Sequence, residues 1–512
     1  MKKEISASKQ LVINMSASFV AYGVTLAISF FLSPYIVRTI GVEANGFVSL
    51  ANNFVSYAGL IVLALNSLAG RFITISIVKG DVKEANKYFS SVYYANLIIA
   101  AFLFVLGSVI VIFLEKLVHI PDNMISDVKL LFTCSFLSCL VSVIGSVFSV
   151  APFARNKLYL ESLRNIESHI ARALIIAGTF AIFSPKVWYV GLAGLVSGIY
   201  VLVCNLYYTK KLLPEIQIKR SSFDGKAVRE LVSSGIWNTI NRLGQILTDG
   251  LDLLIANLLI DSVAMGVLAL AKTVPTIISG LMGNIVGVFS PNYTILYAEE
   301  KYDELLHQIK QSMKIMGVIV NLPIIILVVC GQDFFRLWQP TQDARQLQIL
   351  SILTIACLVI SGGINCLYGV FTVVNKIRTN SLVVVFCGFL STLLTLVTLK
   401  TTNWGVYAVA GVSSVVSIIR NLVFTAPYGA KCLNQKWYTF YPDILRPALY
   451  FAVSVAICLP LMNIIPSGGW LILIVKGVIT SVLSVLIGLF VVLRKGERRL
   501  LFSKLKRRSK NA

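Results

Sequence analysis

Six polar residues form a regular row in an otherwise apolar stretch of the chain: Asn238, Asn241, Arg242, Gln245, Asp249 and Asp252. Their spacing of three or four residues places them on one face of a helix. A charged side chain in the middle of a bilayer costs about 3 kcal/mol or more. A row with one cation and two carboxylates therefore favours a protein interior or a wet cavity over lipid, and it indicates a path for polar cargo.

The members of this row have different chemistry. Its three amides either hydrogen-bond to neighbouring helices or line the path, whereas Arg242 is harder to explain as packing alone. Asp249 and Asp252 lie about one turn apart. They either bind a coupling cation or a proton, or form structural salt bridges with basic residues, and the sequence leaves both readings open.

Further cations occur inside apolar stretches. Arg172 lies about three turns into the segment 160–184, too deep to reach the headgroups easily. Four other cations have similar settings: Arg71, Arg242, Lys272 and Arg420. If these side chains converge, they form a cationic cavity suited to a pyrophosphate or another anion. For Arg71 and Arg420, a position at the membrane surface is an equal alternative.

Composition identifies the elements that must position these residues. The chain has 512 residues, 57% of them hydrophobic and only 13% charged, with a mean hydropathy of +0.81. Apolar stretches of roughly 20 residues, the length that crosses a bilayer, recur along it. We count about fourteen of these stretches and predict an all-α polytopic membrane protein.

The chain has a net charge of +22, and its basic residues are distributed unevenly among the loops between these stretches. If the N-terminus is cytoplasmic, Lys and Arg gather in the loops on the inner side, as the positive-inside rule requires. The sequence therefore predicts both termini in the cytoplasm. It favours membrane lipids over nucleic acid as the partners of the basic tail.

Cysteine and histidine give no sign of a metal or redox centre. Almost all nine cysteines fall inside apolar stretches without a C-x-x-C pair, and the three histidines lie far apart in the sequence. The cysteines are typical of small packing residues. We expect no metal, no cofactor and no catalytic triad.

An internal repeat suggests how the stretches are organised. Shifting the sequence by 220 residues aligns several residues without a gap, including Gly46 with Gly266 and Leu50 with Leu270. Parallel repeats of this kind build transporters with two lobes. The predicted divisions are an N-terminal six-helix lobe at 1–210, a basic cytoplasmic linker at 211–228, a C-terminal six-helix lobe at 229–430, two extra membrane helices at 431–493 and a basic cytoplasmic tail at 494–512.

Two segments carry a resemblance to a known family. A helix ends in P-Y-I-V-R before an I-G-x-E-x-x-G turn, and a K-G-D-x-x-x-A loop follows the next helix. The second half opens similarly with DLLIANLLIDSVAMGVLALAKTVPTII. The chain thus resembles the bacterial polysaccharide exporters of the Wzx O-antigen flippase type, within the superfamily that also holds the multidrug MATE proteins and the lipid II flippases.

The resemblance implies two six-helix bundles around a central cavity, in a protein of the bacterial cytoplasmic membrane. We expect no enzyme, because no loop between the apolar stretches is long enough to hold catalytic groups outside the membrane. It implies flipping of undecaprenyl-pyrophosphate-linked oligosaccharide by alternating access, for O-antigen, capsule or exopolysaccharide synthesis. Arg172, Arg242 and Lys272 are the candidate cavity cations, with Asn241 and Gln245 beside them, and H⁺ or Na⁺ is the candidate coupling ion. A polysaccharide polymerase and other assembly proteins are candidate partners. The alternatives are a cation-coupled multidrug exporter and a lipid II flippase of the same fold.

Overall fold

The computed structural model describes residues 7–492, and this part of the chain is built from helices without any strand. This result confirms the predicted all-α class. The helices divide into two compact units by their contacts. Unit 1 comprises the described residues up to Ile246 together with Leu253–Ala269, and unit 2 comprises Leu247–Asp252 and the described residues from Leu270 onward.

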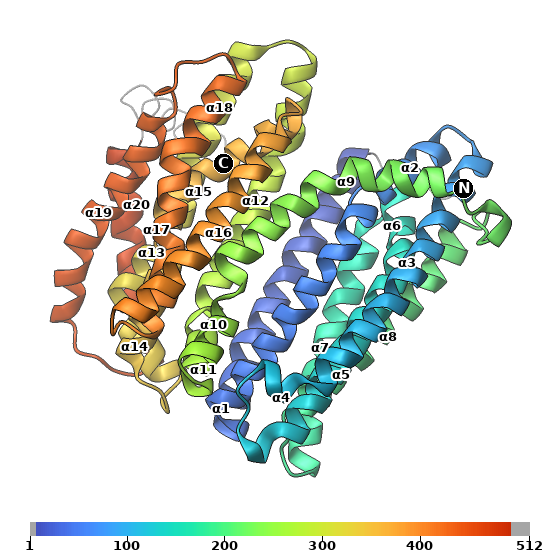
Figure 1. Ribbon diagram of the computed structural model, residues 1–512. Coiled ribbons are helices and arrows are strands. Elements are labelled where there is room, and N and C mark those ends of the chain that lie inside the picture. The colour runs from blue at the N-terminus through green and yellow to red at the C-terminus, as the bar shows by residue number, and fades with distance from the viewer. Residues whose placement is uncertain (1–6, 493–512) are drawn as a thin grey trace. The chain divides into compact units, whose positions relative to one another are not determined.

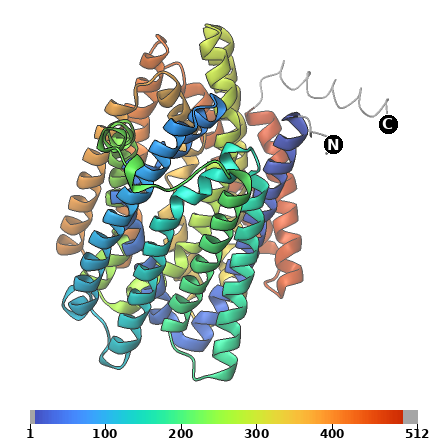
Figure 2. The ribbon, with the colours of Figure 1, turned by 90° about the vertical axis from the view of Figure 1, so that its right-hand side faces the viewer.

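Unit 1 contains the helices of the first half of the chain. They are α1 (Ala7–Asn66), α2 (Ala69–Val78), α3 (Val82–Ile112), α4 (Leu114–Leu117), η1 (Asp122–Met124), α5 (Ile125–Gly145), η2 (Ser146–Ser149), α6 (Val150–Ala154), α7 (Leu158–Ile182), α8 (Trp188–Leu212), η3 (Arg220–Ser222) and α9 (Gly225–Gln245), with most of α10 (Asp252–Leu259) and α11 (Ser262–Ala271). A π-helical turn, η4 (Ile246–Gly250), follows α9. Within the unit, α5 packs against α3 and α8, and α7 packs against α1 and α8 (Figures 1 and 2).

Unit 2 contains the helices of the second half. They are α12 (Thr273–Ala298), α13 (Tyr302–Trp338), α14 (Ala344–Ile355), α15 (Leu358–Val373), α16 (Ile377–Thr401), α17 (Val406–Arg420), the π-helical turn η5 (Asn421–Thr425), α18 (Ala426–Cys432), α19 (Tyr441–Ile464) and α20 (Trp470–Val491). Helix α13 is central to the unit, because it packs against α12, α14, α15, α19 and α20. The lobe boundaries expected from the repeat stay a prediction, since compact contact units need not coincide with a sequence repeat.

The predicted turn after the first apolar stretch lies at a break in α1. Gly41 has φ 89° and ψ 165°, a conformation outside the helical region that side chains with a Cβ rarely adopt. The next glycine, Gly46, packs against α11. A Cβ on Gly46 would lie 2.8 Å from the Cα of Gly266, the residue that the internal repeat aligns with it. Small residues thus let the two backbones meet directly.

Among the described residues, ten helices are long and apolar enough to cross a membrane. The number is eleven if the bent pair α11 and α12 forms one span. The count of fourteen therefore stays a prediction. Two of the stretches that we counted, α7 and the α9–α10 segment, are absent from the ten because they carry more polar side chains. These are the helices that hold Arg172 and the polar row.

The last helix, α20, is polar inside and apolar outside. Its buried residues recur every four positions: Lys476, Thr480, Ser484 and Gly488. Its exposed face carries large apolar side chains, among them Leu471 and Phe490. This arrangement suits a helix surrounded by lipid and reverses that of a helix in water. Together with the apolar spans, it identifies a multi-pass membrane protein.

Two buried ion pairs attach α19 and α20 to α13. The Lys476 ammonium lies 2.7 Å from a carboxylate oxygen of Asp333, and Lys314 lies 3.8 Å from Asp443. The side chain of Lys476 is only 5% exposed, so the pair is largely shielded from solvent. The two C-terminal helices expected from the sequence as additions are thus held to unit 2 by charge as well as by packing.

Candidate functional site

Arg172 lines a small pocket inside unit 1. The pocket has a volume of about 140 Å³ and is formed by side chains of α1, α5, α7 and α8. Its polar lining consists of Arg172, the Asn52 amide and the hydroxyl groups of Ser135 and Ser138. Gly191 allows α8 to approach closely, because a Cβ there would lie 3.0 Å from the Leu131 carbonyl oxygen of α5.

The charge of Arg172 is not balanced within this pocket. Its Nε atom is buried and has no hydrogen-bond partner among the described residues. No Asp or Glu lines the pocket, whereas the Asn52 amide and the Ser135 hydroxyl can donate to an anion's oxygen atoms. The Ser138 hydroxyl donates to the Gly194 backbone carbonyl at 3.4 Å. A guanidinium next to neutral donors has the chemistry to pair with an anionic group such as a phosphate.

The first part of the polar row lies on α9 as expected. Arg242 donates to the Gln245 side-chain oxygen at 3.0 Å, and Gln245 donates to the Asn241 side-chain oxygen at 2.9 Å. The three side chains form a hydrogen-bonded chain along one helix face. Arg242 and Gln245 are exposed, and Asn241 is half-buried. Their remaining donors and acceptors are available to a polar ligand.

The row does not continue unbroken to the two carboxylates. Helix α9 ends at Gln245, and the π-helical turn η4 separates it from Asp252 at the start of α10. A π-helical turn holds more residues than an α-helical turn, so it rotates the following residues away from the original face. Asp249 is exposed, whereas Asp252 is buried with 4% of its surface accessible.

Lys272 and Asp252 form an ion pair within unit 2. The Lys272 ammonium donates to a carboxylate oxygen of Asp252 at 2.7 Å and to the backbone carbonyl of Asp249 at 2.8 Å. The candidate cavity cation and one of the candidate coupling carboxylates therefore neutralise each other. The pairing matches the salt-bridge reading that the sequence left open for Asp252. It does not test the coupling role.

The last two candidate cations differ in their surroundings. Arg71 on α2 is exposed. Arg420, the last residue of α17, is half-buried and donates to the Tyr368 hydroxyl at 3.3 Å. That hydroxyl donates in turn to the Asn421 side chain at 3.0 Å. Arg420 thus belongs to a polar network inside unit 2.

Sequence reasoning missed part of the Arg172 pocket. Ser135 and Ser138 were not singled out, although their spacing of three residues places both on one face of an apolar helix. The nine cysteines are all free. Within residues 7–492, no group of three or more His, Cys, Asp or Glu side chains has an arrangement that could hold a metal ion.

Comparison with known proteins identifies the family. Residues 11–296, more than half of the chain, match the model of the family described as "Polysaccharide biosynthesis protein". The chain belongs to the polysaccharide biosynthesis protein family. The chain is also similar to the uncharacterized membrane protein EpsK of Bacillus subtilis (strain 168), with 26% identity over 495 residues, covering 97% of this chain and 98% of EpsK.

Solved structures share the fold of this polysaccharide biosynthesis protein. The lipid II flippase MurJ in an inward closed conformation matches with a TM-score of 0.67 and 14% identity, covering 93% of this chain and 98% of MurJ. An inward-facing multidrug resistance transporter of the MATE family matches with a TM-score of 0.66 and 12% identity, covering 83% of this chain and 98% of that chain. These likenesses confirm the MATE-like fold expected from the sequence.

Proposed function

We propose that this protein flips undecaprenyl-pyrophosphate-linked oligosaccharide across the bacterial cytoplasmic membrane by alternating access. The step serves assembly of a surface polysaccharide such as O-antigen, capsule or exopolysaccharide. Membership of the polysaccharide biosynthesis family supports the pathway, and the fold shared with membrane transporters supports the transport step. In this proposal both termini face the cytoplasm, which agrees with the distribution of Lys and Arg among the loops.

The Arg172 pocket is the observation that carries the proposal. A cation at the bilayer centre costs about 3 kcal/mol, and Arg172 lines a pocket that contains no carboxylate to balance its charge. The pocket's volume of about 140 Å³ lies well below the roughly 300 Å³ at which small-molecule sites begin. We therefore assign to it one phosphate of the substrate rather than the oligosaccharide.

The polar chain on α9 is the second proposed substrate contact. Arg242 offers further charge to the pyrophosphate, and Asn241 and Gln245 offer amide groups to sugar hydroxyls. Asp249 remains the exposed candidate for ion coupling by H⁺ or Na⁺. Asp252 and Lys272 act as a neutral pair beside it. Arg71 and Arg420 are further proposed contacts of the substrate's anionic headgroup.

The proposal is tested in cells that lack the endogenous gene and express variants at equal membrane levels. Arg172→Gln should strongly reduce surface polysaccharide and cause lipid-linked oligosaccharide to accumulate inside, while Arg172→Lys keeps the charge and should retain more of the activity. Lys400→Gln, at an exposed lysine in the last turn of α16, is the matched control and should behave as the wild type. Normal polysaccharide in the Arg172→Gln strain would refute the assignment.

The same strains distinguish the two alternatives of the same fold. Altered resistance to cationic drugs with intact polysaccharide would identify a multidrug exporter. Arrest of cell-wall synthesis, with accumulation of lipid II, would identify a lipid II flippase. A purified protein that transferred sugar between lipid carriers in detergent would instead show an enzyme.

A further inference from the structure

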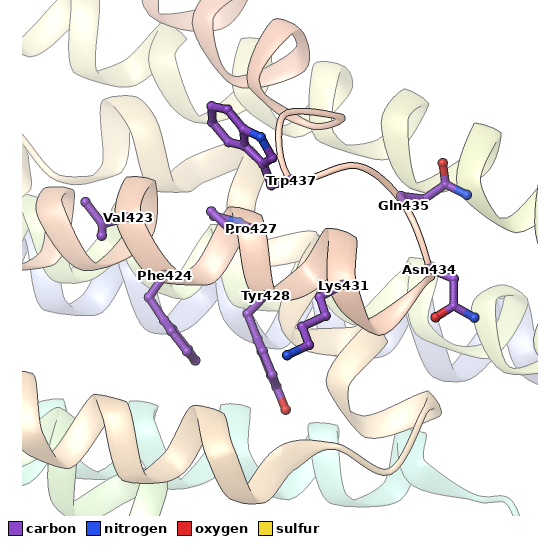
Figure 3. Close-up of a pocket in the computed structure, with 8 residues that line it drawn as sticks. All are labelled: Val423, Phe424, Pro427, Tyr428, Lys431, Asn434, Gln435 and Trp437. Atoms are coloured by element: carbon purple, nitrogen blue, oxygen red, sulfur yellow. The ribbon is translucent and has the colours of Figure 1, made fainter.

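A groove at the end of unit 2 has the chemistry of a lipid headgroup site. It has a volume of about 560 Å³ and lies where η5 and α18 meet the loop that leads to α19. Its lining combines apolar and polar side chains: Val423, Phe424, Pro427, Tyr428, Lys431, Asn434, Gln435 and Trp437 (Figure 3). None of these residues is acidic, and none is used by the substrate contacts proposed above.

The aromatic side chains of the groove are held by ring stacking and hydrogen bonds. The Phe424 and Tyr428 rings stack with their centres 5.0 Å apart and their planes 16° apart. The Tyr428 hydroxyl donates to the backbone carbonyl of Lys376 at 3.1 Å. Trp437 packs edge-on against Tyr441, whose hydroxyl donates to the backbone carbonyl of Leu422 at 2.6 Å. Aromatic side chains of this kind gather where a membrane helix meets the headgroups.

The polar part of the groove has no partners in the protein. In the part of the chain that the structure describes, the side chains of Lys431, Asn434 and Gln435 make no hydrogen bond or ion pair with another residue. Figure 3 shows Lys431 extending from the same side of the helix as Phe424 and Tyr428. The ammonium and the two amides therefore present donors next to an aromatic wall.

The sequence that carries the groove is basic. No Asp or Glu occurs between Asp343 and Asp443. Lys376 lies in the loop whose backbone accepts from Tyr428, and Lys436 follows Lys431 in the loop after α18. Asp443 itself is buried and lies 3.8 Å from Lys314. Charge complementarity within the groove therefore favours an anionic occupant.

An apolar track leads from the groove along the helix. Val415, Ile419 and Val423 are exposed by 56%, 55% and 72%, and Val423 also lines the groove. An occupant with an anionic head and a long apolar tail can contact both parts at once. Free phosphate would use only the polar end, and a neutral lipid would leave the cation unpaired.

We propose that this groove binds one anionic phospholipid, with its phosphate at Lys431, Asn434 and Gln435 and an acyl chain along Val423 and Ile419. The site holds a lipid of the surrounding bilayer against unit 2. It does not depend on the proposed transport of a lipid-linked oligosaccharide, and it would exist in a protein with a different cargo.

Native mass spectrometry of the full-length protein, titrated with dioleoyl phosphatidylglycerol, tests the proposal. One lysine near an anionic membrane surface contributes about 1 kcal/mol, so Lys431→Gln should weaken the tightest lipid binding about fivefold. Lys431→Arg should retain it because the charge remains. Lys400→Gln removes an exposed lysine from the end of α16 and should leave binding unchanged.

Four results would overturn the proposal. The first is equal binding by the wild type and Lys431→Gln, and the second is an equal loss in Lys400→Gln. The third is equally tight binding of dioleoyl phosphatidylcholine, which would remove the requirement for a net negative head. The fourth is that phosphatidylglycerol does not bind, whereas inorganic phosphate or undecaprenyl phosphate binds and Lys431→Gln weakens that binding. This result would assign the groove to another ligand.

Discussion

Replacing Asp252 by Asn removes one half of the buried ion pair in unit 2. Asp252 is 4% exposed, and its partner Lys272 keeps only 19% of its side-chain surface accessible. Breaking a buried pair costs about 3–5 kcal/mol because one charge loses its partner. Lys272 retains its hydrogen bond of 2.8 Å to the Asp249 carbonyl and partial access to solvent. We therefore expect a loss of about 3 kcal/mol in the free energy of unfolding, at the low end of that range.

A double-mutant cycle separates this pair energy from other effects. Asp252→Asn and Lys272→Met are compared with the double variant by unfolding the purified protein in mixed sodium dodecyl sulfate and detergent micelles. The double variant should regain at least about 1.5 kcal/mol relative to the sum of the single variants, because no unpaired charge remains. Additive losses would refute the reasoning, since they would mean that the two groups do not stabilise each other.

The same variants distinguish a structural pair from a coupling site. If the pair is structural, the double variant should transport as well as its restored stability allows, with an unchanged response to proton and sodium gradients. If the Asp252 carboxylate carries the coupling ion, the double variant should be stable and yet insensitive to the gradient. Asp249→Asn, at the exposed neighbouring carboxylate, supplies the parallel measurement for the other candidate.

Two further predictions concern the packing of the helices. Gly46→Ala should lower the free energy of unfolding by about 1–3 kcal/mol, because its Cβ would meet the Gly266 backbone at 2.8 Å. Gly59→Ala on the same helix has no neighbour within 4 Å and should be neutral or slightly stabilising, so equal effects of the two changes would contradict the account. Lys476→Met should destabilise the attachment of α20 by about 3–5 kcal/mol, measured as a lower thermal midpoint in detergent. Lys476→Met combined with Asp333→Asn should recover most of that loss, and no recovery would show that the 2.7 Å contact carries little energy.

The sequence predicted the features that depend on local pattern. Long apolar stretches define helices because backbone groups in lipid must be paired within the helix, so the all-α membrane class follows from composition. The break at Gly41 was expected from the I-G-x-E turn. The contact between Asn241, Arg242 and Gln245 follows from helical spacing alone, because residues three or four apart are neighbours on the surface.

Features that depend on distant contacts were not predictable in the same way. The turn η4 changes the helical register between Gln245 and Asp252, and no residue pattern in the row signals a π-helical turn. The pairing of Asp252 with Lys272 was only one of two open readings, because spacing of 20 residues says nothing about contact. The Arg172 pocket is formed by side chains of four helices, so the sequence alone could not predict that Ser135 and Ser138 line it.

Transbilayer movement of the lipid-linked oligosaccharide in proteoliposomes tests the central claim most directly. Purified protein is reconstituted with undecaprenyl-pyrophosphate-linked oligosaccharide, and an impermeant glycan-modifying enzyme measures the fraction that reaches the outer leaflet. A charged hydrogen bond contributes about 1.5–3 kcal/mol, so Arg172→Gln should slow flipping about 10-fold to 150-fold relative to the wild type. Lys400→Gln should flip at the wild-type rate. Equal rates for the wild type and Arg172→Gln, or no flipping by the wild type above empty vesicles, would contradict the account.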